Sequence, residues 1–172
     1  MCPSFDVDVV VQELVPGMKS VIAKAAGAKA DMLVEHGEKI AFGKHSLEVR
    51  ATPGHTDGCI TFVLNGGTAC FTGDAILIRG CGRTDFQGGN AAMLYTKVHE
   101  QIFSLPDTCN LYPAHDYKGM TSSTVLEEKT LNPRLTKTKD EFIEIMNNLG
   151  LPYPNQIDRA LPLNLMCGVQ DI

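Results

Sequence analysis

The chain reads Thr52-Pro53-Gly54-His55-Thr56 at the end of one predicted strand and Phe71-Thr72-Gly73-Asp74-Ala75 at the end of another. In both stretches an alternating apolar run meets a tight glycine turn, and a residue type that binds metals sits on the turn. Glycine permits the sharp backbone and the preceding strand fixes the direction, so each turn aims its side chain rigidly.

A third copy of this pattern occurs at residues 110–116, which read Asn-Leu-Tyr-Pro-Ala-His-Asp and present His115. A single residue of this kind is more often a turn residue that caps its own backbone. Three strand ends with His, Asp and His instead favour a metal site with imidazole and carboxylate ligands.

Composition excludes several classes of function. The chain has 172 residues, of which 44% are hydrophobic and 20% charged, which predicts one soluble globular domain. The net charge of −5 gives no electrostatic case for nucleic acid as a partner, and no apolar run is long enough to span a membrane. The six cysteines show no metal-binding or disulfide spacing, which is typical of a reduced intracellular protein.

The first half of the chain is predicted to be mainly β-structure. Residues 6–14 are rich in valine and predict a strand. Residues 38–42 with 46–51, and 60–64 with 68–72, predict two hairpins, and Asn65-Gly66 is typical of a type I′ turn. His36 and His45 are expected to be exposed, His45 in a hairpin turn.

The second half is predicted to be mainly helical. Asn90 can cap a helix that runs to Leu105, and capping boxes at Thr124 with Glu127 and at Thr138 with Glu141 open two more. The tail from Pro152 is predicted to be irregular but packed. Strands followed by helices interleaved with strands indicate a layered α/β fold.

Three motifs identify a family. Residues 73–86 read Gly-Asp-Ala-Ile-Leu-Ile-Arg-Gly-Cys-Gly-Arg-Thr-Asp-Phe, residues 112–117 read Tyr-Pro-Ala-His-Asp-Tyr, and residues 130–135 read Thr-Leu-Asn-Pro-Arg-Leu. Over about residues 17–170 the chain resembles the mitochondrial persulfide dioxygenases, a glyoxalase II-like branch of the metallo-β-lactamase superfamily. The resemblance implies an αββα sandwich.

The resemblance also implies an activity, which is the oxidation of glutathione persulfide by O₂ to sulfite and glutathione at a single iron(II). It makes His55 and Asp74 iron ligands, with His115 lining the site. Asp116 could orient His115 through a hydrogen bond.

Three further side chains are implied to contact the substrate, because a guanidinium grips a glutathione carboxylate with two hydrogen bonds. They are Arg83, Tyr117 and Arg134. Structural roles are about as well supported for the two arginines: Arg83 could tie down its loop through Asp85, and Arg134 suits the end of a helix. Tyr117 could be a half-buried loop aromatic. Cys81 could be a reactive thiol, although a small packed residue is favoured.

One family signature, His-x-His-x-Asp-His, is not found in the chain. It supplies the remaining iron-ligand histidine, so we expect weak iron binding and little activity from this chain alone. Residues 1–16 are interpreted as an unrelated segment and residues 17–172 as the C-terminal part of the domain, an incomplete sandwich. The remaining sheet is then expected to expose an apolar face and an edge.

Two alternatives stay open. One is a glyoxalase II-like hydrolase in which zinc cleaves glutathione thioesters. The other is a non-catalytic truncated isoform that pairs its exposed edge with another subunit, giving a homodimer. The resemblance implies the mitochondrial matrix, whereas the acidic start without basic residues predicts a cytoplasmic protein if Met1 is the true start.

Overall fold

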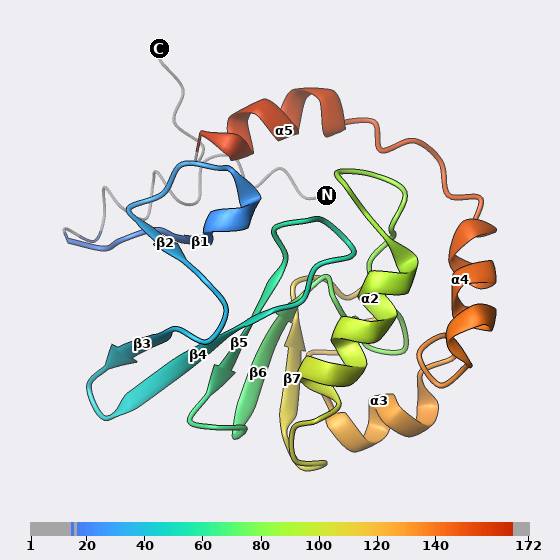
Figure 1. Ribbon diagram of the computed structural model, residues 1–172, viewed down its shortest axis with the longest axis horizontal. Helices are drawn as coiled ribbons and strands as arrows, with labels where there is room; N and C mark the ends of the chain where they lie inside the picture. The colour runs from blue at the N-terminus through green and yellow to red at the C-terminus, as the bar shows by residue number, and fades with distance from the viewer. Residues whose placement is uncertain (1–14, 16, 167–172) are drawn as a thin grey trace. The chain divides into compact units, whose positions relative to one another are not determined.

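The computed structural model describes residue 15 and residues 17–166, so the strand predicted over residues 6–14 lies outside the described part. The backbone forms two compact units (Figure 1). The first combines the described residues up to Val34 with the described residues from Gly150 onward, and the second runs from Glu35 to Leu149. No helix among the described residues is long and apolar enough to cross a membrane.

The larger unit is built on a six-stranded sheet in the order β3-β4-β5-β6-β7-β8. Its strands are β3 (Lys39–Phe42), β4 (His45–Ala51), β5 (Ile60–Leu64), β6 (Ala69–Gly73), β7 (Asn110–Pro113) and β8 (Ser123–Thr124). The two predicted hairpins are confirmed as the antiparallel pairs β3–β4 and β5–β6. Asn65 and Gly66 have φ of 46° and 73°, as a type I′ turn requires.

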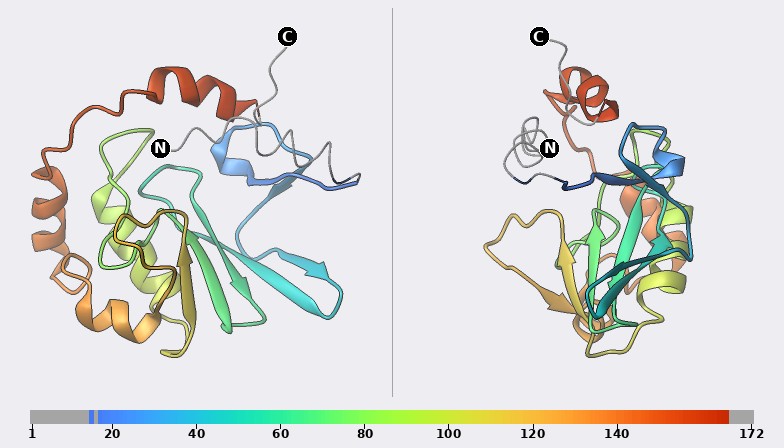
Figure 2. Two further views of the ribbon diagram at one scale, coloured as in Figure 1. Left: turned by 180° about the vertical axis from the view of Figure 1, so that it is seen from behind. Right: turned by 90° about the vertical axis from the view of Figure 1, so that its left-hand side faces the viewer.

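Helices cover one face of this sheet (Figure 2). They are α2 (Ala91–Lys97), which continues as the π-helical turn η2 (Val98–Ile102), then α3 (Val125–Leu131) and α4 (Lys139–Asn147). The cap at Asn90 and both capping boxes are confirmed, since Asn90 accepts from the Met93 amide and the threonine–glutamate pairs exchange bonds.

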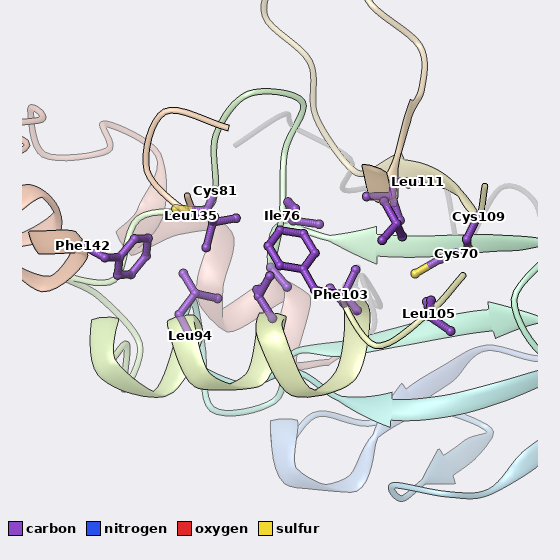
Figure 3. Close-up of a cluster of buried hydrophobic side chains, with 14 of the residues drawn as sticks. Cys70, Ile76, Cys81, Leu94, Phe103, Leu105, Cys109, Leu111, Leu135 and Phe142 are labelled. Carbon is purple, nitrogen blue, oxygen red and sulfur yellow. The ribbon is translucent and has the colours of Figure 1, made fainter. Parts of the chain in front are cut away.

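The core lies between these helices and the sheet. Buried side chains of the strands, such as Val63, Cys70 and Leu111, belong to the same cluster as Leu94 and Phe142 of the helices. Figure 3 shows Leu94, Ile76 and Phe103 gathered above the helix that carries Leu94. Seventeen buried residues form this one cluster, so the helix-covered side of the sheet is a continuous hydrophobic core.

The opposite face of the sheet is apolar and partly open. Strand pairing places Phe62, Phe71 and Tyr112 side by side on this face, because directly paired residues point the same way. Phe71 is 44% exposed and Tyr112 is 40% exposed, and their rings stack with centroids 5.7 Å apart. Phe42, on the same face of β3, is 47% exposed. The expectation of an exposed apolar face is therefore confirmed for these side chains, whereas Val49, which pairs with Phe62 on the same face, is fully buried.

The smaller unit holds the parallel pair β1 (Val21–Ala23) and β2 (Met32–Val34), the 3-10 turn η1 (Lys24–Ala26) and α5 (Ile157–Leu165). The prediction of an irregular tail is wrong, because α5 is helical with Pro162 inside it. The amide of Lys29 donates to the carbonyl of Leu165 at 2.8 Å, which ties the two ends of this unit together.

Two other local predictions differ from the structure. The helix opened by Asn90 leaves α-helical geometry at Val98 and ends at Ile102 rather than Leu105. The Arg50 guanidinium donates to the Gln101 carbonyl at 2.8 Å, which satisfies a backbone group inside the π-helical turn. His45 is the first residue of β4 and half-buried, not an exposed turn residue.

Candidate metal centre

The three predicted strand ends lie on one edge of the sheet. Strand β4 is antiparallel to β5, β5 is antiparallel to β6, and β6 is parallel to β7, so β4, β6 and β7 all run in the same direction. His55, Asp74 and His115 follow these three strands. The topology therefore brings together the three side chains that the sequence pattern singled out.

The turn before His55 is pinned against the start of helix α2. Gly54 has φ of 132°, and a Cβ there would lie 2.5 Å from Leu94 Cα, so only glycine fits. The Gly54 carbonyl accepts a hydrogen bond from the Asn90 amide at 2.8 Å. The helix thus fixes the backbone from which His55 projects.

The His55 ring is held in one tautomer. Its Nδ1 lies 2.6 Å from the Arg83 carbonyl oxygen, which can only accept, so Nδ1 carries the proton. In the neutral ring, Nε2 then bears the lone pair, and it faces Asp74 Oδ2 at 3.4 Å. Both side chains are largely shielded, with exposed fractions of 17% and 22%.

His115 forms a hydrogen bond with the other oxygen of the Asp74 carboxylate. Its Nδ1 donates to Asp74 Oδ1 at 2.7 Å, which leaves Oδ2 facing His55. The His115 ring also stacks on Tyr117, with planes 4° apart and centroids separated by 6.3 Å. His115 thus lies beside Asp74, and its role as a residue lining a metal site stays a prediction.

The pair of His55 and Asp74 fits a metal ion. Two atoms bound to one ion at about 2.1 Å are about 3.0–3.4 Å apart at angles between 90° and 110°. The separation of Nε2 and Oδ2, 3.4 Å, lies in this range. Two facing lone pairs are unfavourable without a cation or proton between them. Among the described residues, no group of three or more His, Cys, Asp or Glu side chains is arranged to hold a metal.

A glycine-rich loop closes over this pair. The Gly82 amide donates to the Asp74 carbonyl at 2.8 Å, and a Cβ on Gly82 would lie 2.8 Å from the His55 ring. Arg83 grips Asp85 with two bonds of 2.7 Å and lies 4.6 Å above the Phe86 ring. These bonds hold the pKa of Asp85 below its usual value. The contacts support the predicted loop-holding role of Arg83.

Cys81, within this loop, packs against Arg134. Cys81 is 4% exposed and its Sγ lies 3.7 Å from Met146 Sδ. Burial raises the pKa of the Cys81 thiol to about 11, so the packed role is favoured over the reactive one. Nη1 of Arg134 lies 3.5 Å from the Cys81 carbonyl and 3.9 Å from Met146 Sδ. Part of the Arg134 guanidinium thus supports the loop.

Asp116 does not play the role that we expected. Its Oδ2 accepts from the backbone amides of Met120 at 2.6 Å and Lys118 at 2.9 Å, and these bonds lower its pKa. The carboxylate therefore closes a local turn, and Asp74 orients His115 instead. Tyr117, expected to be half-buried if structural, is 79% exposed.

Sequence reasoning missed a polar network behind the loop. Glu128 is 1% exposed and binds Arg79, Ser123 and Asn132. Glu128 and the C-cap residue Asn132 are four residues apart, and this spacing was the available signal. The burial that gives the glutamate its importance cannot be inferred from that spacing.

Comparisons with known proteins agree with this geometry. Residues 15–115 match the family model of the metallo-beta-lactamase superfamily. The chain is 61% identical over 160 residues to the mitochondrial persulfide dioxygenase ETHE1 of Homo sapiens, and 60% identical over 161 residues to that of Mus musculus. These matches cover 93% and 94% of the chain but 63% of each relative.

Solved structures show the same fold. The crystal structure of ETHE1 from Myxococcus xanthus superposes with a TM-score of 0.88 at 44% identity, covering 94% of this chain and 71% of that one. The superfamily and these relatives imply a metal cofactor. The chain has the metallo-β-lactamase fold, incomplete relative to these structures, and belongs to the persulfide dioxygenase family of the metallo-beta-lactamase superfamily.

Proposed function

We propose that His55 and Asp74 are two ligands of a single iron(II) in a persulfide dioxygenase that converts glutathione persulfide and O₂ to sulfite and glutathione. The observation that carries this proposal is the pair itself, with the Nε2 lone pair of His55 set 3.4 Å from Asp74 Oδ2. A site with two nitrogen ligands and one carboxylate on one face suits non-haem iron(II) that reacts with O₂. When bound, the iron would supply the redox chemistry with O₂, which the imidazole and carboxylate of this pair lack.

The surrounding residues of the chain orient this pair. The Arg83 carbonyl fixes the tautomer of His55, and His115 holds Asp74 Oδ1 so that Oδ2 points toward His55. These bonds to the ligands set their direction and basicity, as partners of metal ligands do in other sites. His115 is therefore a neighbour of the metal and not a ligand.

We place the substrate beside Tyr117. Its ring is 79% exposed and stacks on His115, which is itself bonded to Asp74, so a molecule bound there would lie next to the ligand pair. Arg83 and Arg134 are expected to contact glutathione carboxylates through their guanidinium groups. A substrate carboxylate that binds the Arg83 guanidinium would compete with Asp85 for it. Asp85 is 54% exposed, so we expect its side chain to be displaced.

Because the chain spans 63% of its human and mouse relatives, we expect the 172-residue chain alone to bind iron weakly and to turn over slowly. Purified chain would be assayed for bound metal, for O₂ uptake with glutathione persulfide, and for hydrolysis of a glutathione thioester. Iron-dependent O₂ uptake below that of Myxococcus xanthus ETHE1 is expected. Zinc-dependent hydrolysis without O₂ uptake would replace the proposal with the hydrolase.

Uptake equal to that of the bacterial enzyme would refute the expected weakness, and no uptake with any metal would support the non-catalytic alternative.

The relatives of human and mouse are named as mitochondrial proteins, and we propose the matrix for this one. Import of the full protein into isolated mitochondria tests that location, and a protein that stays outside them would support the cytoplasmic alternative.

A further inference from the structure

A buried carboxylate lies behind the metal-ligand pair, outside the residues that the proposed function uses. Glu128, on helix α3, is 1% exposed, which is rare for a charged side chain unless it is fully paired. Its Oε1 accepts from the Arg79 guanidinium and from Ser123 Oγ, at 2.7 Å for the latter. Its Oε2 accepts from the Arg79 amide at 3.0 Å and from Asn132 Nδ2 at 2.8 Å.

The carboxylate holds Arg79 in an unusual conformation. Arg79 has φ of 58°, in the left-handed region that non-glycine residues seldom adopt. Glu128 binds both the backbone amide and the guanidinium of this residue, and Glu127 binds the other side of the guanidinium at 3.0 Å. An uncommon conformation persists only when its surroundings fix it, and here the carboxylate does so.

Asn132 extends the same network to the glycine-rich loop. Its Nδ2 also donates to the Gly80 carbonyl at 3.0 Å, while its Oδ1 accepts from the amides of Arg134 and Leu135. Asn132 is fully buried. The beginning of the loop, at Arg79 and Gly80, is thus fixed to helix α3 by Glu128 and Asn132.

The other end of this short loop contacts both metal ligands. Gly82 donates to the Asp74 carbonyl at 2.8 Å, and the Arg83 carbonyl accepts from His55 Nδ1 at 2.6 Å. Only three residues separate Arg79 from Arg83. A shift of the loop at Arg79 would therefore move the carbonyl that sets the His55 tautomer.

We propose that Glu128 is a positioning residue for the metal-ligand pair, acting through Arg79 and Asn132 on the loop of residues 79–83. It touches neither metal nor substrate. The effect on metal affinity rests on the proposed function, whereas the effect on the His55 ring does not. Replacement by glutamine keeps the shape of the side chain and removes the charge that holds Arg79.

The first test reads the His55 tautomer by ¹⁵N NMR of the histidine rings in the full chain without metal. We compare Glu128→Gln and Asn132→Ala, which cut the network at two points, with Val125→Ala. Val125 is fully buried on the same helix but makes no side-chain bond to the loop, so it controls for lost stability. Both network variants should lose the fixed Nδ1-protonated form of His55, and the control should keep it.

The second test measures Co²⁺ affinity of the same variants from the visible spectrum. We expect about a tenfold loss in Glu128→Gln, the lower end of what outer partners of metal ligands contribute, and less than a twofold change in Val125→Ala. If the unmutated chain binds no Co²⁺, the proposed function fails, but the NMR comparison still decides this inference. Folded Glu128→Gln and Asn132→Ala proteins with an unchanged His55 tautomer would overturn it.

Discussion

The two faces of the sheet formed by β3–β8 carry apolar side chains in the same strands but differ in what covers them. On one face, Val63, Cys70 and Leu111 are at most 2% exposed beneath the helices. On the other, Phe71 and Tyr112 stack on each other and remain 44% and 40% exposed. Apolar sheet faces are normally buried against a second layer.

The two faces contribute differently to the molecule. The covered face gives a rigid frame, since helix α2 pins the turn of His55 through Gly54, and helix α3 anchors the loop above it through Glu128. The open face belongs to a chain that spans 63% of its human and mouse relatives. Because Phe71 and Tyr112 are exposed, we expect the open face to favour association, while the covered face holds the proposed pair of ligands in position.

The largest expected effect comes from a matched pair of phenylalanines on the two sides. Phe142 is fully buried among the helices. Its replacement by alanine should lower the free energy of unfolding by about 3–5 kcal/mol, because the lost side chain leaves a cavity. Phe71→Ala on the open face should cost about 1 kcal/mol or less. Urea unfolding measures both, and equal losses would show that the open face is covered in solution.

A matched pair of glycines tests the frame around His55. Gly54→Ala should destabilise the chain by about 3 kcal/mol, because the new methyl group meets Leu94 and the backbone has φ of 132°. Gly43→Ala, in a turn with open space around it, should cost only about 1–2 kcal/mol from its φ of 56°. Thermal unfolding measures the two melting temperatures. Equal melting temperatures for Gly54→Ala and Gly43→Ala would contradict the prediction.

Polar substitutions on the open face should change association with little change in folding. We expect Phe71→Lys with Tyr112→Thr to reduce binding of a hydrophobic dye and self-association, while unfolding free energy changes by about 1 kcal/mol or less. Sedimentation velocity and dye fluorescence are the measurements. Met93→Lys, on an exposed site of helix α2, is the control. If the double variant sediments like the unmutated chain, the open face does not drive self-association, and the prediction is wrong.

The smallest expected effect on stability is that of alkylating agents, which report how accessible and how reactive a cysteine is on each face. Cys81 lies on the covered side, and its burial raises the pKa of the thiol to about 11, so almost no thiolate exists at pH 8. Alkylation should be slow in the folded chain and become faster as pH rises toward 11. A raised pKa also means that the stability from the neutral thiol is present below pH 9 and is lost at higher pH. Phe71→Cys on the open face should react rapidly, and mass spectrometry of the labelled peptides tells the two positions apart.

Much of the fold follows from local signals in the sequence. Asn65-Gly66 and the capping boxes predict features that depend on a few neighbouring residues, and the structure contains them. The π-helical turn at Val98 was not predictable, because the bond from Arg50 to Gln101 joins distant residues. Helix α5 was missed because Pro162 disfavours a helix interior, and tertiary context overrides that preference.

In the candidate site, too, some features follow from the local sequence and others depend on tertiary packing. The repeated strand–glycine pattern correctly predicts that His55, Asp74 and His115 come together, because strand direction determines the edge on which they lie. The role expected for Asp116 was wrong, since local backbone amides compete successfully for its carboxylate. Glu128 was missed because its burial depends on the packing of the whole loop.

The most direct test of the central claim, that His55 and Asp74 are a prearranged but incomplete set of metal ligands, is a Co²⁺ titration of the purified 172-residue chain. Variants His55→Ala and Asp74→Ala would be compared with His36→Gln, whose exposed histidine makes no bond to either ligand among the described contacts. The account predicts weak binding that either ligand variant abolishes and the control retains. Co²⁺ binding that survives both ligand substitutions would contradict it.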